Sequence, residues 1–393
     1  MLVQKYKDML SGKSVIRQLS EFATARGQEI GYENVFDYSL GNPSVPVPRE
    51  FTDRMIHMLA TKEPLELHGY SPSLGITSVR EAIAENLEKK FGLPYRKEHI
   101  FMASGAAGAL AHAFRLVTEP GDEILTFAPF FPEYHPYVDL TGAVLKVVPP
   151  NLENFQINFE AFEEMLTEKV KAVLITTPNN PSGVVYSTPT LQRLADILSE
   201  KSKEYGHIIY LISDEPYREI VFEGVDSPCV SYFYDNTIMC YSFSKSLSLP
   251  GERIGYLVIP DEVADSEKLN AAANVATRIL GFVNAPTLQQ KLVKYCLEEK
   301  TDISYYDRNR EVLYQGLRNL GFSCIKPEGA FYLFMKSPVA DEKQFCEAAK
   351  KYHILIVPGS SFSCPGYVRI AYCVSYETIL NSLDSFRKLA EEF

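Results

Sequence analysis

The sequence contains no tryptophan and no run of 18 apolar residues among its 393 positions. Without such a run, no segment is long enough to cross a bilayer as an apolar helix. Without tryptophan, any ring that stacks on a bound ligand must come from phenylalanine, tyrosine or histidine. The first residues, MLVQKYKDMLSGKS, also lack the apolar stretch of a signal peptide. These absences predict a cytoplasmic protein.

The cysteines and histidines lack the spacing that is typical of a metal site. The seven cysteines are odd in number and form no C-x-x-C pair, which fits reduced thiols better than disulfides or a zinc site. The seven histidines show no metal spacing either. His112, in the helical stretch AHAFRL, is expected to be a packed or partly exposed residue and not a metal ligand. We therefore expect no metal site.

Basic residues are in the minority, with 39 Lys and Arg against 50 Asp and Glu and a net charge of −11. Phosphate backbones select basic surfaces, so nucleic acid is not expected as the main partner. The 46% hydrophobic and 23% charged residues are typical of a globular protein. At roughly 150 residues per domain, the length of the chain predicts two or three structural units.

From about residue 75 to 260, helical patterns alternate with short apolar runs. The stretches 76–92 and 188–206 have the helical period. Runs of five or six residues are rich in Ile, Val and Tyr and predict buried strands at 99–103, 122–127, 171–176, 208–213, 237–242 and 255–260. This alternation predicts an α/β fold with a mostly parallel sheet flanked by helices.

After about residue 285 the pattern changes to mixed short strands and helices. The segment 321–335 predicts a hairpin, and 367–374 predicts a strand. We expect a smaller α+β domain here, against which the first 45 or so residues pack. The predicted division is a large domain over 45–285 and a small domain made of 1–44 and 286–393.

Polar residues follow three of the predicted strands. Lys245 follows TIMCYS, Asp214 follows IIYLIS and Asn180 follows KAVLITTP. Because ligands of open α/β sheets bind beyond the carboxyl ends of the strands, these side chains are expected to converge. A lone lysine is more often a solvated loop residue, but here it lies between serines and ahead of Gly-Glu-Arg-Ile-Gly.

The segment 242–255 resembles the cofactor-attachment motif of the class I and II pyridoxal-phosphate-dependent aminotransferases, the aspartate aminotransferase-like group of fold type I. Other segments resemble that family's motifs in the family's order: 69–83, 104–110, 129–134, 178–183 and 214–217. The resemblance covers roughly residues 14 to 390. It implies a large domain with a seven-stranded type of sheet, and pyridoxal 5′-phosphate as the cofactor.

The resemblance also implies roles for the residues around the cofactor ring. Lys245 would carry the cofactor as a Schiff base, and Asp214 would pair with the pyridine nitrogen. Asn180 and Tyr217 would hydrogen-bond the phenolic oxygen, while Phe131 would stack on the ring. Read alone, Asp214 could instead cap a helix and Phe131 could be a core residue.

The phosphate is expected at the start of a helix. Small residues let the backbone approach an anion, and the free N–H groups of a helix N-terminus attract it. The expected phosphate ligands are Ser104, Gly105, Ala106, Ala107, Ser242, Ser244 and Arg253. Tyr70 resembles a tyrosine that reaches the phosphate of the neighbouring subunit. This implies a homodimer with shared active sites.

Arg369 lies among apolar neighbours in YVRIAY, and a buried arginine needs an anion. The resemblance implies that it binds the substrate α-carboxylate; an internal salt bridge is the alternative. Gly41 and Asn42 are expected to line the same pocket, together with Asn180. Arg278 could reach a distal carboxylate across a dimer or could be a surface residue, and the sequence leaves both open.

Taken together, the resemblance implies an aminotransferase that moves an amino group between an L-amino acid and a 2-oxo acid by a ping-pong mechanism. One alternative is a carbon–sulfur β-lyase on the same fold. Such lyases commonly carry Asp-Glu-Ile-His where this chain has Asp-Glu-Pro-Tyr at 214–217. A second alternative, a cofactor-binding regulator on this fold, is disfavoured by the acidic charge and by the few residues before the matching region. The sequence does not indicate which amino acid is preferred.

Overall fold

The computed structural model describes residues 2–3, 6–7, 10 and 15–393. Its main feature is a seven-stranded sheet in the order β2-β8-β7-β6-β5-β3-β4. The strands are β2 (Ile100–Ala103), β3 (Glu123–Phe127), β4 (Val144–Val148), β5 (Val170–Thr176), β6 (Tyr210–Asp214), β7 (Thr237–Ser242) and β8 (Gly255–Val258). β8 is antiparallel to both neighbours, and all other pairs are parallel. The predicted α/β fold with a mostly parallel sheet is therefore confirmed.

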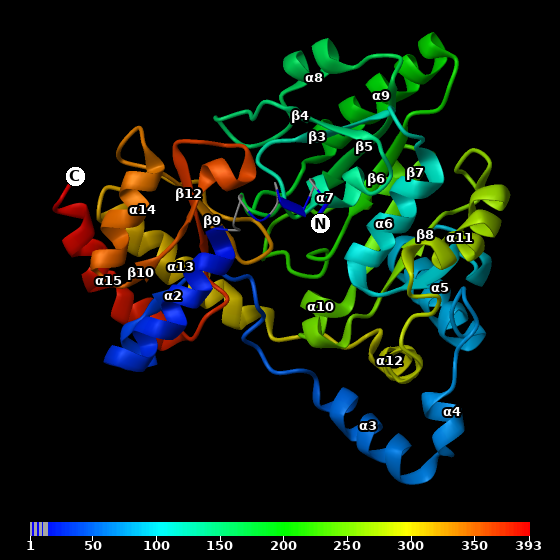
Figure 1. The fold of residues 1–393 in the computed structure, drawn as a ribbon, viewed down its shortest axis with the longest axis horizontal. Coiled ribbons are helices and arrows are strands. Elements are labelled where there is room, and N and C mark those ends of the chain that lie inside the picture. The colour runs from blue at the N-terminus through cyan, green and yellow to red at the C-terminus, as the bar shows by residue number, and fades with distance from the viewer. Residues whose placement is uncertain (1, 4–5, 8–9, 11–14) are drawn as a thin grey trace.

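Helices cover both faces of this sheet (Figure 1). From β5, Ala172 and Leu174 pack with α6 (Gly105–Val117), α7 (Tyr134–Asp139) and α11 (Ser266–Leu280). Val173 and Ile175 face the other way, toward α8 (Phe159–Met165) and α9 (Thr188–Tyr205). Nearer β2, that second face is covered by α5 (Thr77–Phe91) and α12 (Thr287–Val293). The alternation arises because successive side chains of a strand point to opposite faces.

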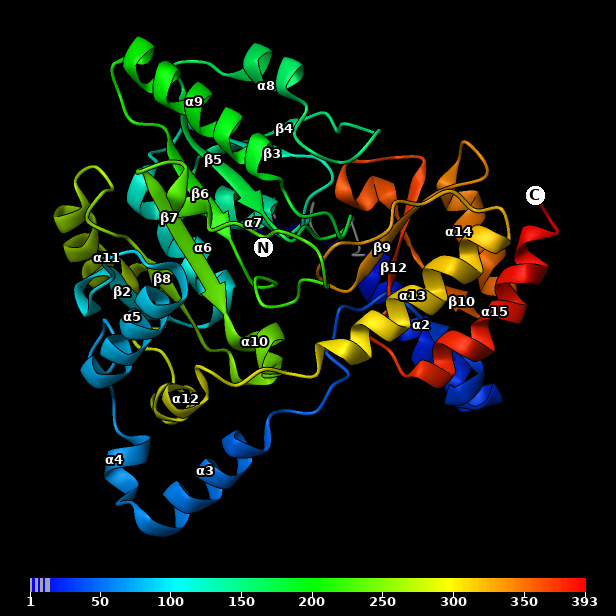
Figure 2. The ribbon, with the colours of Figure 1, turned by 180° about the vertical axis from the view of Figure 1, so that it is seen from behind.

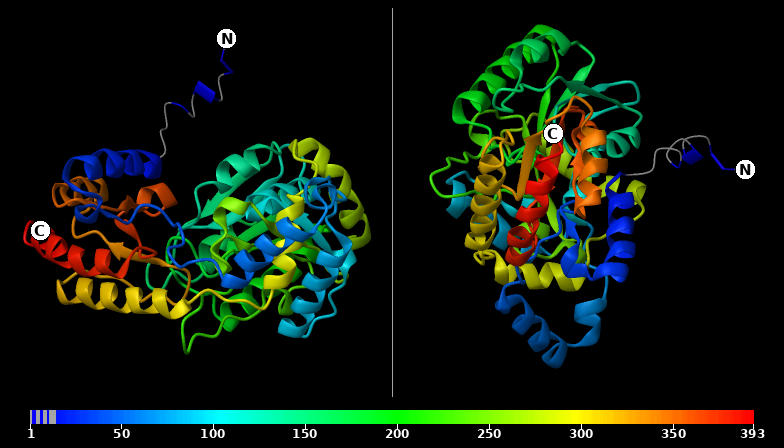
Figure 3. Two further views of the ribbon diagram at one scale, coloured as in Figure 1. Left: turned by 90° about the horizontal axis from the view of Figure 1, so that it is seen from below. Right: turned by 90° about the vertical axis from the view of Figure 1, so that its left-hand side faces the viewer.

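A smaller antiparallel sheet lies beside the large one, in the order β11-β12-β9. It consists of β9 (Tyr332–Lys336), β11 (Val357–Pro358) and β12 (Tyr367–Ala371). Around it lie α2 (Val15–Ile30), α13 (Ile303–Asn319), α14 (Glu342–Lys351) and α15 (Tyr376–Ala390), as Figures 2 and 3 show. β1 (Phe36–Asp37) pairs with β10 (Ile354–Leu355). The N-terminal segment thus packs on the C-terminal one, while the division at residues 45 and 285 stays a prediction.

Two local features differ from the sequence-based expectation. Within 321–335 only an isolated bridge between Cys324 and Met335 forms, and β9 pairs with β12 instead of completing a hairpin. Pro327 lies in this stretch and has no N–H to donate to a ladder. β4 was not among the expected strands. It is an edge strand in which only Val148 is buried, and Lys146 interrupts its otherwise apolar sequence VLKVV.

The remaining helices are α3 (Arg49–Thr61) and α4 (Pro64–His68), which stand out from the body of the molecule in Figure 1, and the single turn α10 (Phe243–Ser246) directly after β7.

α9 illustrates how local sequence sets the ends of an element. The Ser187 side chain accepts a hydrogen bond from the Thr190 N–H at its start, and Gly206 adopts the left-handed conformation at its end. None of the helices in the described part of the chain is long and apolar enough to span a membrane.

Candidate active site

A cavity of about 370 Å³ opens at the carboxyl ends of β5, β6 and β7. Asn180, Asp214 and Lys245, which the sequence places after three separate strands, all line it. β12 contributes Arg369 from the small sheet, and the N-terminal segment contributes Gly41. The expected convergence of polar side chains at one edge of the sheet is therefore present in the fold.

Lys245 is held in the one-turn helix α10. Its Nζ donates a hydrogen bond to the Gly41 carbonyl oxygen at 2.7 Å and lies 5.5 Å from the centroid of the Phe331 ring. The pKa of the Lys245 amine is lowered to about 8, mainly by burial and to a smaller extent by the positive charges of Arg253 and Arg369. A substantial fraction of this amine is therefore neutral near pH 8.

Asp214 ends β6 with only 4% of its surface exposed. Its Oδ2 accepts a hydrogen bond from the Tyr134 hydroxyl at 2.7 Å, whereas its Oδ1 has no hydrogen-bond partner. Burial raises the pKa of the Asp214 carboxyl to about 7, with a smaller contribution from the neighbouring Glu215 carboxylate. A buried carboxylate with a free oxygen is costly unless a cation or donor pairs with it. As Asp214 belongs to a strand end, the helix-cap alternative does not apply.

Arg369 is 2% exposed and lies between two aromatic rings, with its guanidinium carbon 4.7 Å from the centroids of both Tyr332 and Phe362. Its Nη1 donates to Asn180 Oδ1 at 3.0 Å and its Nη2 donates to the Ser39 carbonyl oxygen at 2.5 Å. Nε has no partner, and no carboxylate of the described residues forms an ion pair with this side chain. The internal salt bridge that the sequence left open is absent from the described structure.

One end of the cavity has the character of an anion site. Ala106 and Ala107, in the first turn of α6, line it together with Ser242, Ser244 and Arg253. Arg253 adopts a left-handed backbone conformation with φ of 50°, which is unusual for a residue with a side chain. A Cβ atom added to Gly105 would lie 3.1 Å from Arg253 Nη2, so the glycine allows the guanidinium to approach the helix start closely.

The structure places the predicted residues in two groups. Those that line the cavity are Gly41, Ala106, Ala107, Phe131, Asn180, Asp214, Tyr217, Ser242, Ser244, Lys245, Arg253 and Arg369. Ser104, Gly105, Asn42 and Tyr70 do not line it in this single subunit. Asn42 is exposed in this single subunit, so its expected place in the pocket beside Gly41 stays a prediction. Tyr70 is 98% exposed, and Arg278 lies on the exposed side of α11.

Several tyrosines of the site were not assigned a role from the sequence. Tyr134 lies within the motif at 129–134 and bonds Asp214. The Tyr217 and Tyr332 hydroxyls share a hydrogen bond of 2.8 Å, and a Cβ atom on Gly41 would collide with the Tyr332 hydroxyl. Glycine is thus required at position 41, because the Tyr332 hydroxyl lies too close to leave room for a side chain. The sequence signal for Tyr332 is only the strand pattern of AFYLFM, which does not tell which residue faces the site.

His112 lies in the core, as expected for a packed residue. It is fully buried and contacts the Phe101 ring edge-on at a centroid distance of 4.6 Å. Burial lowers its pKa to about 4. Within residues 15–393 and the few described before them, no three His, Cys, Asp or Glu side chains are grouped as metal ligands would be.

A polar cavity at the strand ends of a mostly parallel sheet is where α/β enzymes bind their ligands. The family model described as "Aminotransferase class I and II" matches residues 33–386. The chain therefore belongs to the class I and II aminotransferases, and it is an enzyme of the transferase class.

Individual relatives agree with this assignment. A solved structure of an aminotransferase from Eubacterium rectale is 46% identical, with a TM-score of 0.97 over 100% of this chain and 99% of that one. The aspartate aminotransferase of Thermotoga maritima is 30% identical over 94% of this chain and 97% of the relative, and its structure superimposes with a TM-score of 0.85. Aromatic-amino-acid aminotransferase 2 of Thermococcus litoralis is also 30% identical, over 96% of each chain.

Proposed function

We propose that the protein transfers an amino group between an L-amino acid and a 2-oxo acid, with pyridoxal 5′-phosphate as its cofactor, in a ping-pong cycle. One observation carries the proposal. Lys245, Asp214 and Arg369 line a single cavity, and each keeps bonding capacity that no described residue uses. Asp214 Oδ1 and Arg369 Nε have no partner, and the hydrogen bond of Lys245 Nζ goes only to a backbone carbonyl.

The lining residues fit this cofactor. The unpartnered Asp214 oxygen would accept from a protonated pyridine nitrogen, and that positive charge would hold the carboxylate ionised at neutral pH. Tyr217 and the amide nitrogen of Asn180 would donate to the phenolic oxygen, while Phe131 would contact the ring. The phosphate would be held by the start of α6 with Ser242, Ser244 and Arg253. When bound, the cofactor supplies an electron sink for negative charge at the substrate Cα.

Lys245 would move the proton during the reaction. Its lowered pKa of about 8 provides a neutral amine that can take the proton from the substrate Cα. Arg369 would bind the substrate α-carboxylate through two parallel hydrogen bonds and so present Cα to Lys245 Nζ. Both the outgoing and the incoming 2-oxo acid need this one arginine, so the first must leave before the second binds.

We further propose that the enzyme is a homodimer whose subunits share their sites. Tyr70 is nearly fully exposed, and the apolar side chains of Leu65 and Ile279 are 87% and 67% exposed. The proposal rests on the resemblance of Tyr70 to a tyrosine that reaches a neighbouring subunit, and its exposure leaves it accessible to such a contact. In such a dimer Tyr70 would reach the phosphate of the neighbouring subunit. The cytoplasmic location stays a prediction.

The reaction type distinguishes the proposal from the carbon–sulfur β-lyase alternative. With an amino acid alone, the enzyme is expected to stop after one turnover per site and to accumulate pyridoxamine phosphate, because no acceptor removes the amino group. Adding 2-oxoglutarate should restore continuous turnover. Product analysis with several donors, cystathionine among them, checks this. Sustained release of pyruvate from cystathionine without an oxo-acid acceptor would instead establish the lyase.

Replacing Arg369 with lysine should raise KM for every amino acid tested. Lysine keeps the positive charge but loses the planar pair of donors. A lost charge-assisted hydrogen bond of about 1.5–3 kcal/mol corresponds to roughly a 10- to 150-fold increase. Steady-state kinetics with aspartate, alanine and an aromatic donor measure the change. Arg193→Lys is the control, because Arg193 pairs with Glu163 on the surface. An unchanged KM would remove Arg369 from substrate binding.

A further inference from the structure

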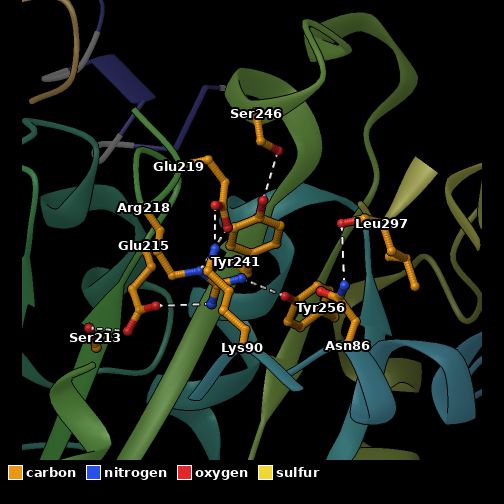
Figure 4. A network of polar contacts seen from close by, with 10 residues as sticks. All are labelled: Asn86, Lys90, Ser213, Glu215, Arg218, Glu219, Tyr241, Ser246, Tyr256 and Leu297. Carbon is orange, nitrogen blue, oxygen red and sulfur yellow. Dashed lines mark hydrogen bonds and ion pairs between the residues drawn. The ribbon is translucent and has the colours of Figure 1, made fainter. Parts of the chain in front are cut away.

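A second cavity, of about 310 Å³, lies on the other side of the segments that carry the site residues. Asp214 and Tyr217 face the first cavity, whereas Arg218 and Glu219 line the second. After β7 the same division holds, since Lys245 lines the first cavity and Ser246 the second. Neighbouring residues of the same two segments therefore line the two cavities. Figure 4 shows these contacts.

Arg218 is the centre of the network in the second cavity, with 10% of its side chain exposed. Its Nη1 donates to Glu215 Oε2 at 3.1 Å and its Nε donates to Glu219 Oε1 at 3.2 Å. Nη2 donates to the Tyr256 hydroxyl on β8 at 2.9 Å. Glu219 is paired on its other oxygen with Lys90 of α5. All three nitrogens of the guanidinium are thus bonded, and they join the loop after β6 to β8.

The same guanidinium also contacts β7. Its carbon lies 4.1 Å from the centroid of the Tyr241 ring, and the Tyr241 hydroxyl donates to Ser246 Oγ at 2.8 Å. Ser246 follows Lys245 directly in α10. Glu215, the neighbour of Asp214, is further held by the Ser213 hydroxyl at 2.8 Å. A continuous set of contacts therefore runs from the residue after Asp214, through Arg218 and Tyr241, to the residue after Lys245.

A buried ion pair is seldom the most stable way to fill such a space. Desolvating the charges offsets much of their attraction, and apolar residues of similar volume often stabilise a fold equally well. The planar guanidinium instead fixes directions, because each of its donors bonds in a defined geometry. We propose that Arg218 is a positioning residue, which holds Asp214 and Tyr217 in place relative to Lys245 without touching substrate or cofactor. This inference rests on the proposed function.

Arg218→Met in the holoenzyme tests the proposal, with Arg310→Met as the matched control. Arg310 is 11% exposed, pairs with Asp307 and lies over the Phe222 ring at 4.1 Å, but it does not line the first cavity. We expect kcat of Arg218→Met to fall by about 10²-fold, the cost of a small misplacement of reacting groups, with KM for the amino donor close to wild type. The absorbance of the cofactor bound to Lys245 changes with pH, and the midpoint of this change should shift by about one pH unit. The reason is that Asp214 and Tyr217, which would bond the cofactor, move when Arg218 is replaced.

Arg310→Met should lower the melting temperature comparably but leave kcat and the pH midpoint unchanged. If Arg218→Met does not fold, Tyr256→Phe removes a single contact of the network, and Tyr205→Phe, whose hydroxyl donates to Leu166, is its control. For Tyr256→Phe we expect a fall in kcat of less than about 10²-fold and a displaced pH midpoint, neither of which Tyr205→Phe should show. Variants that lose stability while keeping the wild-type kcat and midpoint would overturn the positioning role alone. A wild-type protein that forms no cofactor–lysine absorbance at all would overturn the proposed function and this inference with it.

Discussion

Replacing Lys245 with alanine is expected to reduce kcat by about 10²- to 10⁴-fold, the range that a positioned general acid–base contributes. The amine of Lys245 has a pKa of about 8, so it can act as a base near neutral pH. It also lines the same cavity as Arg369, which would bind the substrate. Lys245→Arg should be as inactive as Lys245→Ala, because a guanidinium cannot give up its proton in a protein. Single-turnover kinetics of both variants measure the effect.

The pH dependence of cofactor uptake provides an independent check on Lys245. Only the neutral amine can attack the cofactor's aldehyde, and the amine loses its proton as the pH rises through its pKa. Attachment to apoenzyme should therefore accelerate with rising pH and level off above about 8, which is the pKa of Lys245. Lys146→Ala, on the edge strand β4, should retain wild-type uptake and turnover. Substantial turnover by Lys245→Ala would rule out the assigned role.

Replacing Asp214 with asparagine should reduce kcat by about 10²- to 10³-fold while leaving the fold intact. Asparagine has the same shape and can still accept the hydrogen bond of the Tyr134 hydroxyl. What it loses is the negative charge, which is needed to hold the pyridine nitrogen protonated. Circular dichroism and melting curves establish that the fold is retained, and half-reaction kinetics measure the loss.

Asp261→Asn is the control for this substitution, because the Asp261 carboxylate pairs with Arg96 at an exposed position. It should behave as wild type. If Asp214→Asn turns over at nearly the wild-type rate, the charge of Asp214 has no part in the reaction and the proposed orientation of the cofactor is wrong.

The large sheet could be predicted from the sequence because its inner strands are short apolar runs separated by stretches with the helical period. Lys245, Asp214 and Asn180 could be placed together because each follows such a strand and parallel strands end at a common edge. These inferences need only local patterns and one topological rule. The edge strand β4 was not among the expected strands, because Lys146 interrupts its apolar sequence VLKVV.

Contacts between distant segments could not be predicted in this way. The bond from Lys245 Nζ to the Gly41 carbonyl joins positions 204 residues apart, and the collision that excludes a side chain at Gly41 involves Tyr332. Nothing in the local pattern of either segment indicates the other. Exposure alone also does not decide a role: Asn42 is exposed in the single subunit, and its predicted contact with the pocket stays a prediction.

The covalent site of the cofactor tests the central claim most directly. Holoenzyme should be yellow, and borohydride should fix the cofactor to the protein by reducing its bond to the lysine. Digestion and peptide mapping by mass spectrometry then locate the modified residue. We predict a single pyridoxyl-modified peptide that carries Lys245, and none in the Lys245→Ala variant. A label on another lysine, or no label after incubation with pyridoxal 5′-phosphate, would contradict the account.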